Sequence, residues 1–373
     1  MPNPKKLFFI TLALLIVSGA ALFVYNFFIQ EQTAPAEQNN QPSPENFDLK
    51  PKIILRERVL APTISQDNQT IKYYLATNGH VFVSDFDGQN LNEISTVDLP
   101  GISEIVWSPD KTKVADFTQN QSGAMQPSVF DYTTKRFFSL NPNIKNIVWS
   151  PNSQKIAYQF QSSNGSTEIS IANPDGSNWK NISKTRLKNF KISWPSPDKI
   201  SLVSDLGGKE PGSLIIINPE TGDLTTLLNN IYGLAVNWSP DGQKFIFQQT
   251  DQNGKNLKLY LGRVDGAQAP KELPVQTLAK KCVWASDSQT IYCAVPQKLS
   301  SNAIWPDDYL AGHLVVDDDF YLIDTSTAKK TGLTQLDKTD ISVDGQNLFL
   351  SPLEDYLFFI NQKNGWLYNI KLK

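Results

Sequence analysis

Histidine and cysteine are scarce in this sequence, with two of each in 373 residues. The two histidines, His80 and His313, form no His-Glu-x-x-His or His-x-His pair, so a zinc site of familiar spacing is not visible. The Gly-x-Ser-x-Gly turn of serine hydrolases and the glycine-rich phosphate-binding loops are also missing. The sequence therefore indicates no catalytic residue, no metal ligand and no cofactor.

Charge is low and evenly spread. Charged residues make up 19% of the chain, the net charge is −3, and no long basic run occurs. A nucleic-acid-binding surface is therefore not expected. Hydrophobic residues reach 40%, which excludes disorder over most of the chain. After residue 51 no stretch keeps a helical period, so the fold should be built from strands.

The N-terminus predicts a membrane anchor. Residues 1–6 form a short stub with Lys5 and Lys6, and residues 7–29 are apolar and uncharged. A helix of that length spans a bilayer, and the basic pair places the stub in the cytoplasm. A cleaved signal peptide is the alternative, with Ser18 and Ala20 before the cut. Residues 30–51, rich in Gln, Asn, Pro and Glu, read as a flexible stalk, so the rest should be an extracytoplasmic part of a single-pass membrane protein.

An internal repeat organises residues 52–373. Five tryptophans lie in similar Trp-Ser-Pro-Asp motifs, 42 to 46 residues apart: Trp107, Trp149, Trp194, Trp238 and Trp284. Degenerate copies at Ile64 and Leu350 bring the number to seven. In six copies a strand-forming residue follows seven positions later, and in the fourth Ile200 follows after six. A constant offset predicts a hairpin of fixed register.

Each unit holds four short strands in about 44 residues. Units of this kind are typical of an all-β, seven-bladed propeller. The five tryptophans are then expected to pack between blades, since a buried aromatic contributes about 1.5–3 kcal/mol whatever the protein does.

These repeats resemble the WD-repeat-like β-propeller of the TolB family, and they are similar to the propeller domains of dipeptidyl-peptidase and prolyl-oligopeptidase relatives. The resemblance covers residues 52 to 373 and implies architecture, because the fold hosts many activities. Two departures are expected: the 22-residue stalk leaves no room for the α/β domain of TolB, and no hydrolase domain follows before Lys373.

The sixth unit is roughly 20 residues longer than its neighbours, because it carries an insertion at about residues 296–318. Three interpretations stay open: a structural flap, a loop that binds a partner or glycan, and a cation site at the three consecutive aspartates. The candidate binding residues are Trp305, Asp307, Asp308, Tyr309, His313, Asp317, Asp318 and Asp319.

Two pairings follow from register. The orphan strand Ile53–Leu60 should close the ring beside Gly365–Ile370, because the seventh unit lacks a fourth strand. In the sixth hairpin, Cys282 should face Cys293 as Trp284 faces Ile291, and an oxidising compartment would favour a disulfide. Buried free thiols are the alternative.

The sequence leaves two functions open. The first is a non-catalytic binding or scaffold module for an envelope protein, peptide or glycan. The alternative is a hydrolase or lyase with its site in the propeller channel, which three or more convergent ionisable groups with perturbed pKa values would favour.

Overall fold

The computed structural model describes residues 49–97, 99, 101–119, 123–162, 165–185, 189–204, 207–336 and 341–373. The expected stub, the membrane segment 7–29 and nearly all of the stalk lie outside these residues. Within the described part, no helix has the length and apolar character needed to span a bilayer.

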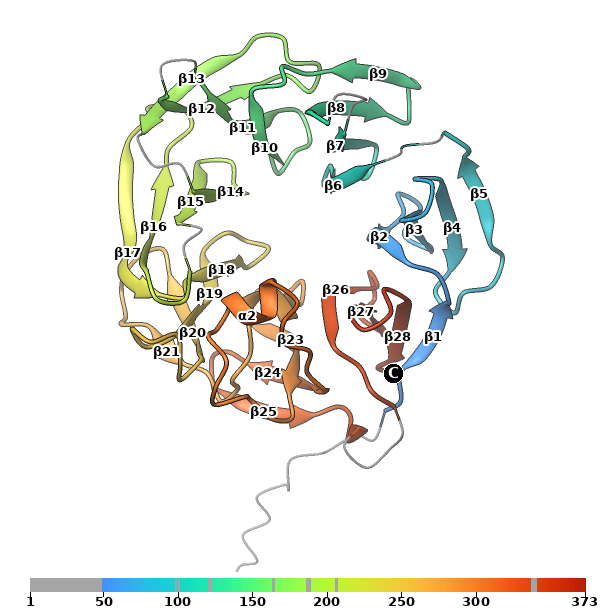
Figure 1. Ribbon diagram of the computed structural model, residues 1–373, viewed down its shortest axis with the longest axis vertical. Helices are drawn as coiled ribbons and strands as arrows, with labels where there is room; N and C mark the ends of the chain where they lie inside the picture. Colours follow the sequence, from blue (N-terminus) through green and yellow to red (C-terminus); the bar gives the residue numbers. More distant parts are fainter. Residues whose placement is uncertain are drawn as a thin grey trace, which may run out of the picture. The chain divides into compact units, whose positions relative to one another are not determined.

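The unit that begins at Asn46 contains seven four-stranded antiparallel sheets arranged as the blades of a propeller (Figure 1). In blades 1 to 6 the strands follow one another in chain order, and the first strand of each blade lies nearest the centre (Figure 1). The prediction of an all-β, seven-bladed propeller is therefore confirmed for residues 49–373.

The strands of blades 1 to 3 are β2 (Val59–Ile64), β3 (Thr70–Leu75), β4 (Val81–Asp85), β5 (Asn92–Ser95), β6 (Ile102–Trp107), β7 (Lys113–Gln119), β8 (Met125–Asp131), β9 (Arg136–Ser139), β10 (Ile144–Trp149), β11 (Ile156–Gln161), β12 (Thr167–Ala172) and β13 (Lys180–Thr185). Those of blades 4 and 5 are β14 (Phe190–Ser196), β15 (Lys199–Ser204), β16 (Pro211–Ile217), β17 (Leu224–Tyr232), β18 (Ala235–Trp238), β19 (Lys244–Gln249), β20 (Lys258–Arg263) and β21 (Lys271–Glu272).

Blade 6 contains the short 3-10 turn η3 (Ala279–Lys281), then β22 (Cys282–Trp284), β23 (Thr290–Pro296), the single-turn helix α2 (Asp307–Leu310), β24 (Asp318–Asp324) and β25 (Lys329–Gly332). Blade 7 contains β26 (Gly345–Leu350), β27 (Tyr356–Asn361) and β28 (Leu367–Lys371), and β1 (Lys52–Leu55) completes it.

In blades 2, 3 and 5 a serine-centred turn holds the first hairpin. In blade 2 the hydroxyl of Ser108 donates to Asp110 Oδ1 at 2.6 Å, and the backbone N–H of Lys113 donates to Ser108 Oγ at 2.9 Å. Ser150 and Ser239 repeat these contacts in blades 3 and 5. The predicted seven-residue offset appears as six facing pairs: Ile64 with Ile71, Trp107 with Val114, Trp149 with Ile156, Trp238 with Phe245, Trp284 with Ile291, and Leu350 with Leu357.

The repeated tryptophans connect neighbouring blades. Three indole N–H groups donate to a backbone carbonyl in the inner hairpin of the preceding blade: Trp107 to Ala61, Trp149 to Val106, and Trp284 to Asn237. Trp238 donates to the hydroxyl of Ser201. Blade 4 departs from the pattern, since its inner pairing shifts register between Ser193 and Ser196 and the buried Trp194 Nε1 has no hydrogen-bond partner among the described atoms.

The ring closes within blade 7. Strand β1 pairs with β28, with Ile53 opposite Tyr368, so the outer strand of this blade comes from the start of the domain. The predicted bounds of that strand, Ile53–Leu60, are wrong at the C-terminal end. The strand ends at Leu55, and the residues from Val59 onward form the inner strand of blade 1. The chain must pass here from the outer edge of one blade to the centre of the next, which a continuous strand cannot do.

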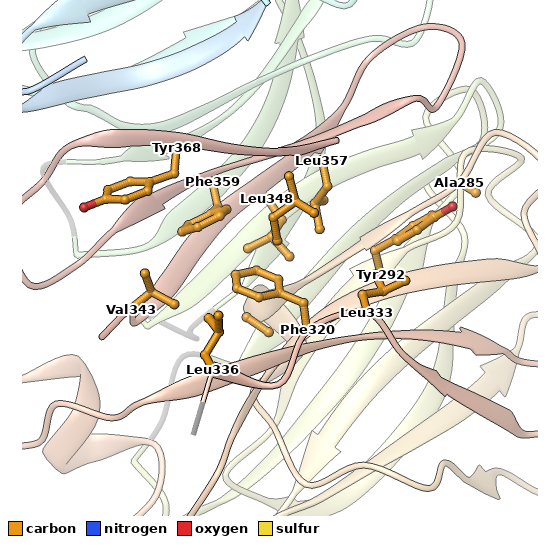
Figure 2. Packing of buried hydrophobic residues seen from close by; sticks show 12 residues of the cluster. Ala285, Tyr292, Phe320, Leu333, Leu336, Val343, Leu348, Leu357, Phe359 and Tyr368 are labelled. Atoms are coloured by element: carbon orange, nitrogen blue, oxygen red, sulfur yellow. The ribbon is translucent and has the colours of Figure 1, made fainter. Parts of the chain in front are cut away.

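Cores lie between adjacent blades. Figure 2 shows the cluster between blades 6 and 7, in which Phe320 of β24 and Phe359 of β27 have ring centroids 4.7 Å apart. Leu357 and Tyr368 belong to the same buried cluster. Each large buried side chain contributes about 1.5–3 kcal/mol, so every blade depends on its neighbour for its apolar surface.

Cys282 and Cys293 face each other across the first hairpin of blade 6. Their sulfur atoms are bonded at 2.08 Å. Both residues are buried in the apolar cluster that joins blades 5 and 6. The register inferred from the sequence is therefore the register observed.

Candidate functional site

The insertion of blade 6 runs from the end of β23 at Pro296 to the start of β24 at Asp318, and contains α2. It is attached to blades 4 and 5. The backbone N–H of Trp305 donates to the carbonyl of Gly254 at 2.8 Å, and the N–H of Gly208 donates to Asp307 Oδ1 at 2.8 Å. Trp305 is 2% exposed and Tyr309 is 1% exposed, and their rings stack. The insertion is thus an ordered cap.

Most of the aspartates expected to bind a ligand are engaged within the protein. Asp308 Oδ2 accepts the N–H of Ile304 at 2.7 Å. Asp319 Oδ1 accepts the N–H of Leu336 at 2.6 Å, and Asp317 Oδ1 accepts the hydroxyl of Ser342 at 2.6 Å and pairs with Lys363. These contacts hold the insertion and the neighbouring loops in place.

His313 is exposed at the end of α2, and its backbone N–H donates to the carbonyl of Asp308. The other histidine, His80, lies in blade 1, where its Nδ1 is 2.6 Å from Glu93 Oε1. In the described part of the chain, no group of three or more His, Cys, Asp or Glu residues is placed to hold a metal ion.

Asp318 and Tyr309 join a buried ionic network below the cap. Lys281 Nζ lies 2.6 Å from Asp318 Oδ2 and 2.6 Å from Asp344 Oδ1, and all three side chains have no exposed surface. The hydroxyl of Tyr309 donates to Asp344 Oδ1 at 2.6 Å. The network therefore ties the insertion to η3 and to the start of β26.

Burial controls the ionisation of this network. Loss of solvent raises the pKa of Asp318 to about 6, and the neighbouring Lys281 ammonium opposes the shift. Burial and the nearby Asp344 carboxylate raise the pKa of Tyr309 well above its usual range. Asp318 Oδ1 is buried and makes no hydrogen bond within the described residues. The network contains one lysine against two aspartates and is closed to solvent, so its role is structural.

An open cavity of about 290 Å³ lies in the channel, on the face where the inner strands begin. Its walls come from the inner strands of blades 2 to 5 and from the segment leading into blade 6, and Pro306 and Leu310 of the cap complete them. The ionisable side chains of this lining are Glu104 of β6, Lys191 of β14 and Lys280 of η3. Ligand sites are usually preformed concave pockets of this kind, with mostly apolar walls and a few polar groups.

The environment of the channel favours the neutral forms of Glu104 and Lys280. Withdrawal from solvent raises the pKa of the Glu104 carboxyl, and the charge of Lys191 opposes that shift. Loss of solvent, together with repulsion from Lys281 and Lys191, lowers the pKa of Lys280 to about 8. The Lys280 ammonium lies 4.9 Å from the centre of the Tyr309 ring, which holds it at the cavity wall.

Sequence reasoning missed all three channel residues, although the repeat contains a signal for them. Glu104, Asn146, Lys191 and Ala235 each lie three positions before the Trp of their repeat, and all four line the cavity. Register shifts occur at or beside this position in blades 2 and 3, and such bulges redirect side chains. In blade 6 the position three residues before Trp284 lies in the turn η3. Lys281 at this position belongs to the buried network, and its neighbour Lys280 reaches the cavity.

No protein-family model matches the sequence, and no curated protein matches it either. Solved structures do match. An oligogalacturonate lyase from Vibrio parahaemolyticus has a TM-score of 0.61 at 10% identity, with 87% of this chain and 94% of that chain covered. An oligogalacturonate lyase in complex with manganese gives 0.62 at 10% identity, with 87% and 93% covered.

TolB from Acinetobacter baumannii is 16% identical, with a TM-score of 0.47 and 75% of this chain and 64% of that chain covered. The β-propeller domain of the Trilobed protease from Pyrococcus furiosus and an acylaminoacyl peptidase are also among the similar structures. The likeness to the two lyases, at 10% identity, shows a shared fold alone and leaves the activity to be argued from the site.

Proposed function

We propose that this chain is a membrane-anchored, extracytoplasmic propeller that binds an envelope protein, peptide or glycan without transforming it, at the capped mouth of its channel. The observation that supports this most is the cap itself. Two residues of the blade 6 insertion, Pro306 and Leu310, complete the wall of the channel cavity, and the insertion is fixed to blades 4 and 5. A preformed cavity spares the cost of ordering a loop on binding.

Affinity capture with the full detergent-solubilised chain tests this proposal. Leu310 is 51% exposed on the cap, so Leu310→Asp places a charge at the cavity mouth with little effect on folding. The matched control is Leu353→Asp, because Leu353 is 80% exposed in the β26–β27 turn at the opposite end of the inner strands. We expect a partner that the wild type and the control retain and that Leu310→Asp loses. Equal recovery with all three proteins would refute a site at the cap.

The second candidate is a lyase or hydrolase in the same cavity, and the ionisations of Glu104 and Lys280 favour it. A carboxyl group with a raised pKa and an amine with a pKa lowered to about 8 are suited to general acid and base roles near neutral pH. Incubation with oligogalacturonate, followed by the absorbance of unsaturated product, separates the two functions. Binding alone predicts no product. Turnover that Lys280→Met abolishes would establish the enzyme instead.

A further inference from the structure

A second cavity lies outside the channel, in the cleft between blades 2 and 3, whose outer strands β9 and β13 are on the rim of the ring (Figure 1). Its volume is about 360 Å³, and ligand pockets usually measure ~300–1,000 Å³. The segment that leads from β9 into β10 forms one wall, and β11, β12 and the turn after β12 form the other. The cleft shares no lining residue with the channel cavity, so it is a separate site.

Trp179 lines this cleft and is open to solvent. It is 64% exposed, whereas the five tryptophans of the repeat are buried or half-buried. Tyr158 and Phe160 of β11 add two more aromatic side chains to the lining. A large indole left uncovered beside a concave, partly apolar wall is available to stack on a flat ligand.

The turn that carries Trp179 is held in place. Asp175 Oδ1 accepts the N–H of Ser177 at 3.0 Å and the Ser177 hydroxyl at 2.6 Å. Gly176 has a φ of +82°, and a Cβ there would lie 3.2 Å from Leu140 Cδ2, so the turn packs directly on the opposite wall. The cleft is therefore preformed, and a ligand need not order it.

The polar groups of the cleft include both an acceptor and a donor. The Ser177 hydroxyl and N–H lower the pKa of Asp175, so this carboxylate is ionised at neutral pH. Its Oδ2 makes no hydrogen bond within the described residues and is left to accept one from a ligand. Asn141 Oδ1 accepts the N–H of Asn143 at 3.0 Å, which leaves the Nδ2 group of Asn141 to donate.

A hydroxyl group fits this pair, because it donates and accepts at once. A cation only donates and would leave the Asn141 amide without an acceptor, and an anion would be repelled by Asp175. Glu168, the other carboxylate in the lining, is already paired with Lys184 at 3.0 Å, so it does not add an uncompensated charge. These groups favour a neutral ligand that has several hydroxyls and a flat apolar face.

We infer that the cleft between blades 2 and 3 binds a neutral sugar ring. The C–H face of the pyranose lies on the Trp179 indole, one hydroxyl donates to Asp175 Oδ2, and a hydroxyl accepts from Asn141 Nδ2. This site goes beyond the proposed channel site and does not depend on it.

Saturation-transfer NMR with the full chain tests this inference with defined probes. The protein is kept in a polyoxyethylene detergent, which has no sugar headgroup. The sugar probes are cellotriose, maltotriose and triacetylchitotriose, glycerol serves as an acyclic polyol, and choline serves as a cation. We expect binding of at least one trisaccharide and of neither glycerol nor choline.

Substitutions at the platform locate the binding. Trp179→Ala should weaken it at least about tenfold, and Trp179→Phe should restore part of it, because a smaller aromatic face remains. The matched control is Leu91→Ala, which should bind as the wild type does. Leu91 holds the equivalent position after the Asp-Gly turn of blade 1 and is 53% exposed. Unchanged thermal unfolding of these variants verifies that each is folded.

The carboxylate is tested by Asp175→Asn. This variant keeps an oxygen that can accept from Ser177 and removes the charge that strengthens a hydrogen bond from the sugar. We expect the affinity for the bound trisaccharide to fall about tenfold.

Tryptophan fluorescence gives an independent readout of position. A sugar ring that covers the exposed Trp179 indole should shift the emission to shorter wavelength. Trp179→Phe should bind without that shift, because no other tryptophan in the described residues lines the cleft.

Four results would overturn the inference: no binding of any trisaccharide, undiminished binding by Trp179→Ala, glycerol binding as well as the sugars do, or binding of choline in their place. The last would indicate a cation site instead. Each of these leaves the proposed function intact if Leu310→Asp still loses its captured partner, so the two failures are distinguishable.

Discussion

Lys280 and Lys281 are adjacent in the chain and occupy opposite environments. The Lys280 ammonium lines an open cavity and has a pKa lowered to about 8, whereas Lys281 is wholly buried and paired with two aspartates. One residue of offset thus separates a side chain that reaches the channel cavity from one that holds the insertion against blade 7. The difference shows that the same type of side chain is exposed to the cavity or buried in an ionic network according to how η3 directs it.

The largest expected effect comes from removing the buried member of the pair. Lys281→Met leaves Asp318 and Asp344 without their cation inside the protein, which costs about 3–5 kcal/mol of unfolding free energy. Lys280→Met removes only the contact of its ammonium with the Tyr309 ring and should change stability by about 1 kcal/mol or less. Denaturant unfolding of both variants measures the contrast. Similar losses for the two variants would show that the comparison is mistaken.

The disulfide that follows the two lysines should matter next. Cys282 begins β22 directly after Lys281, and its bond to Cys293 fixes the register that directs the lysines apart. Replacing both cysteines by alanine removes a short cross-link and should cost about 2–3 kcal/mol. Thermal and denaturant unfolding give the value. A double variant as stable as the wild type would mean that the hairpin needs no cross-link.

The ionisation of Asp318 gives the network a pH dependence. Because burial raises its folded pKa to about 6, above an unfolded value near 3.9, the folded state binds more protons between these values. The stability contributed by Asp318 therefore falls as pH rises through this window. Between pH 4.5 and pH 7 the wild type should lose about 2 kcal/mol relative to Asp318→Asn. A stability difference independent of pH would show that Asp318 stays ionised throughout.

The smallest expected effect concerns the attachment of the cap. A Cβ at Gly208 would lie 2.0 Å from the carbonyl oxygen of Trp305, so Gly208→Ala must displace the cap backbone. The neighbouring Gly207→Ala meets only the Asp307 carboxylate, at 2.9 Å, and a shift of that side chain strains its hydrogen bond to the Gly208 N–H but leaves the backbone of the cap in place. We expect a loss of about 1 kcal/mol and faster amide exchange at Trp305 for Gly208→Ala alone. Matching exchange rates in the two variants would argue against a fixed cap.

The repeat allowed most of the fold to be predicted. A fixed offset in each hairpin determines register, and register determines both the facing pairs and the position of Cys282 opposite Cys293. The break after Leu55 was missed, although the charged residues 56–58 separate the apolar residues before it from Val59 and Leu60.

The candidate site was predicted less well, for a physical reason. Asp307 and Asp318 were expected to face a ligand, but Gly208, Lys281 and Gly345 bond to them from distant parts of the chain. Hydrogen-bond partners of that separation leave no local pattern. Glu104 and Lys191 could have been found by aligning the position three residues before each Trp, since that position recurs at the channel wall.

Site-specific photocrosslinking in intact cells tests the proposed binding site most directly. A benzophenone amino acid at position 310 would lie on the cap, and the same group at position 353 would lie on the turn at the opposite end of the inner strands. If the capped channel binds the partner, a discrete adduct forms from position 310, and position 353 gives none. Adducts from position 353 with none from position 310 would contradict the account.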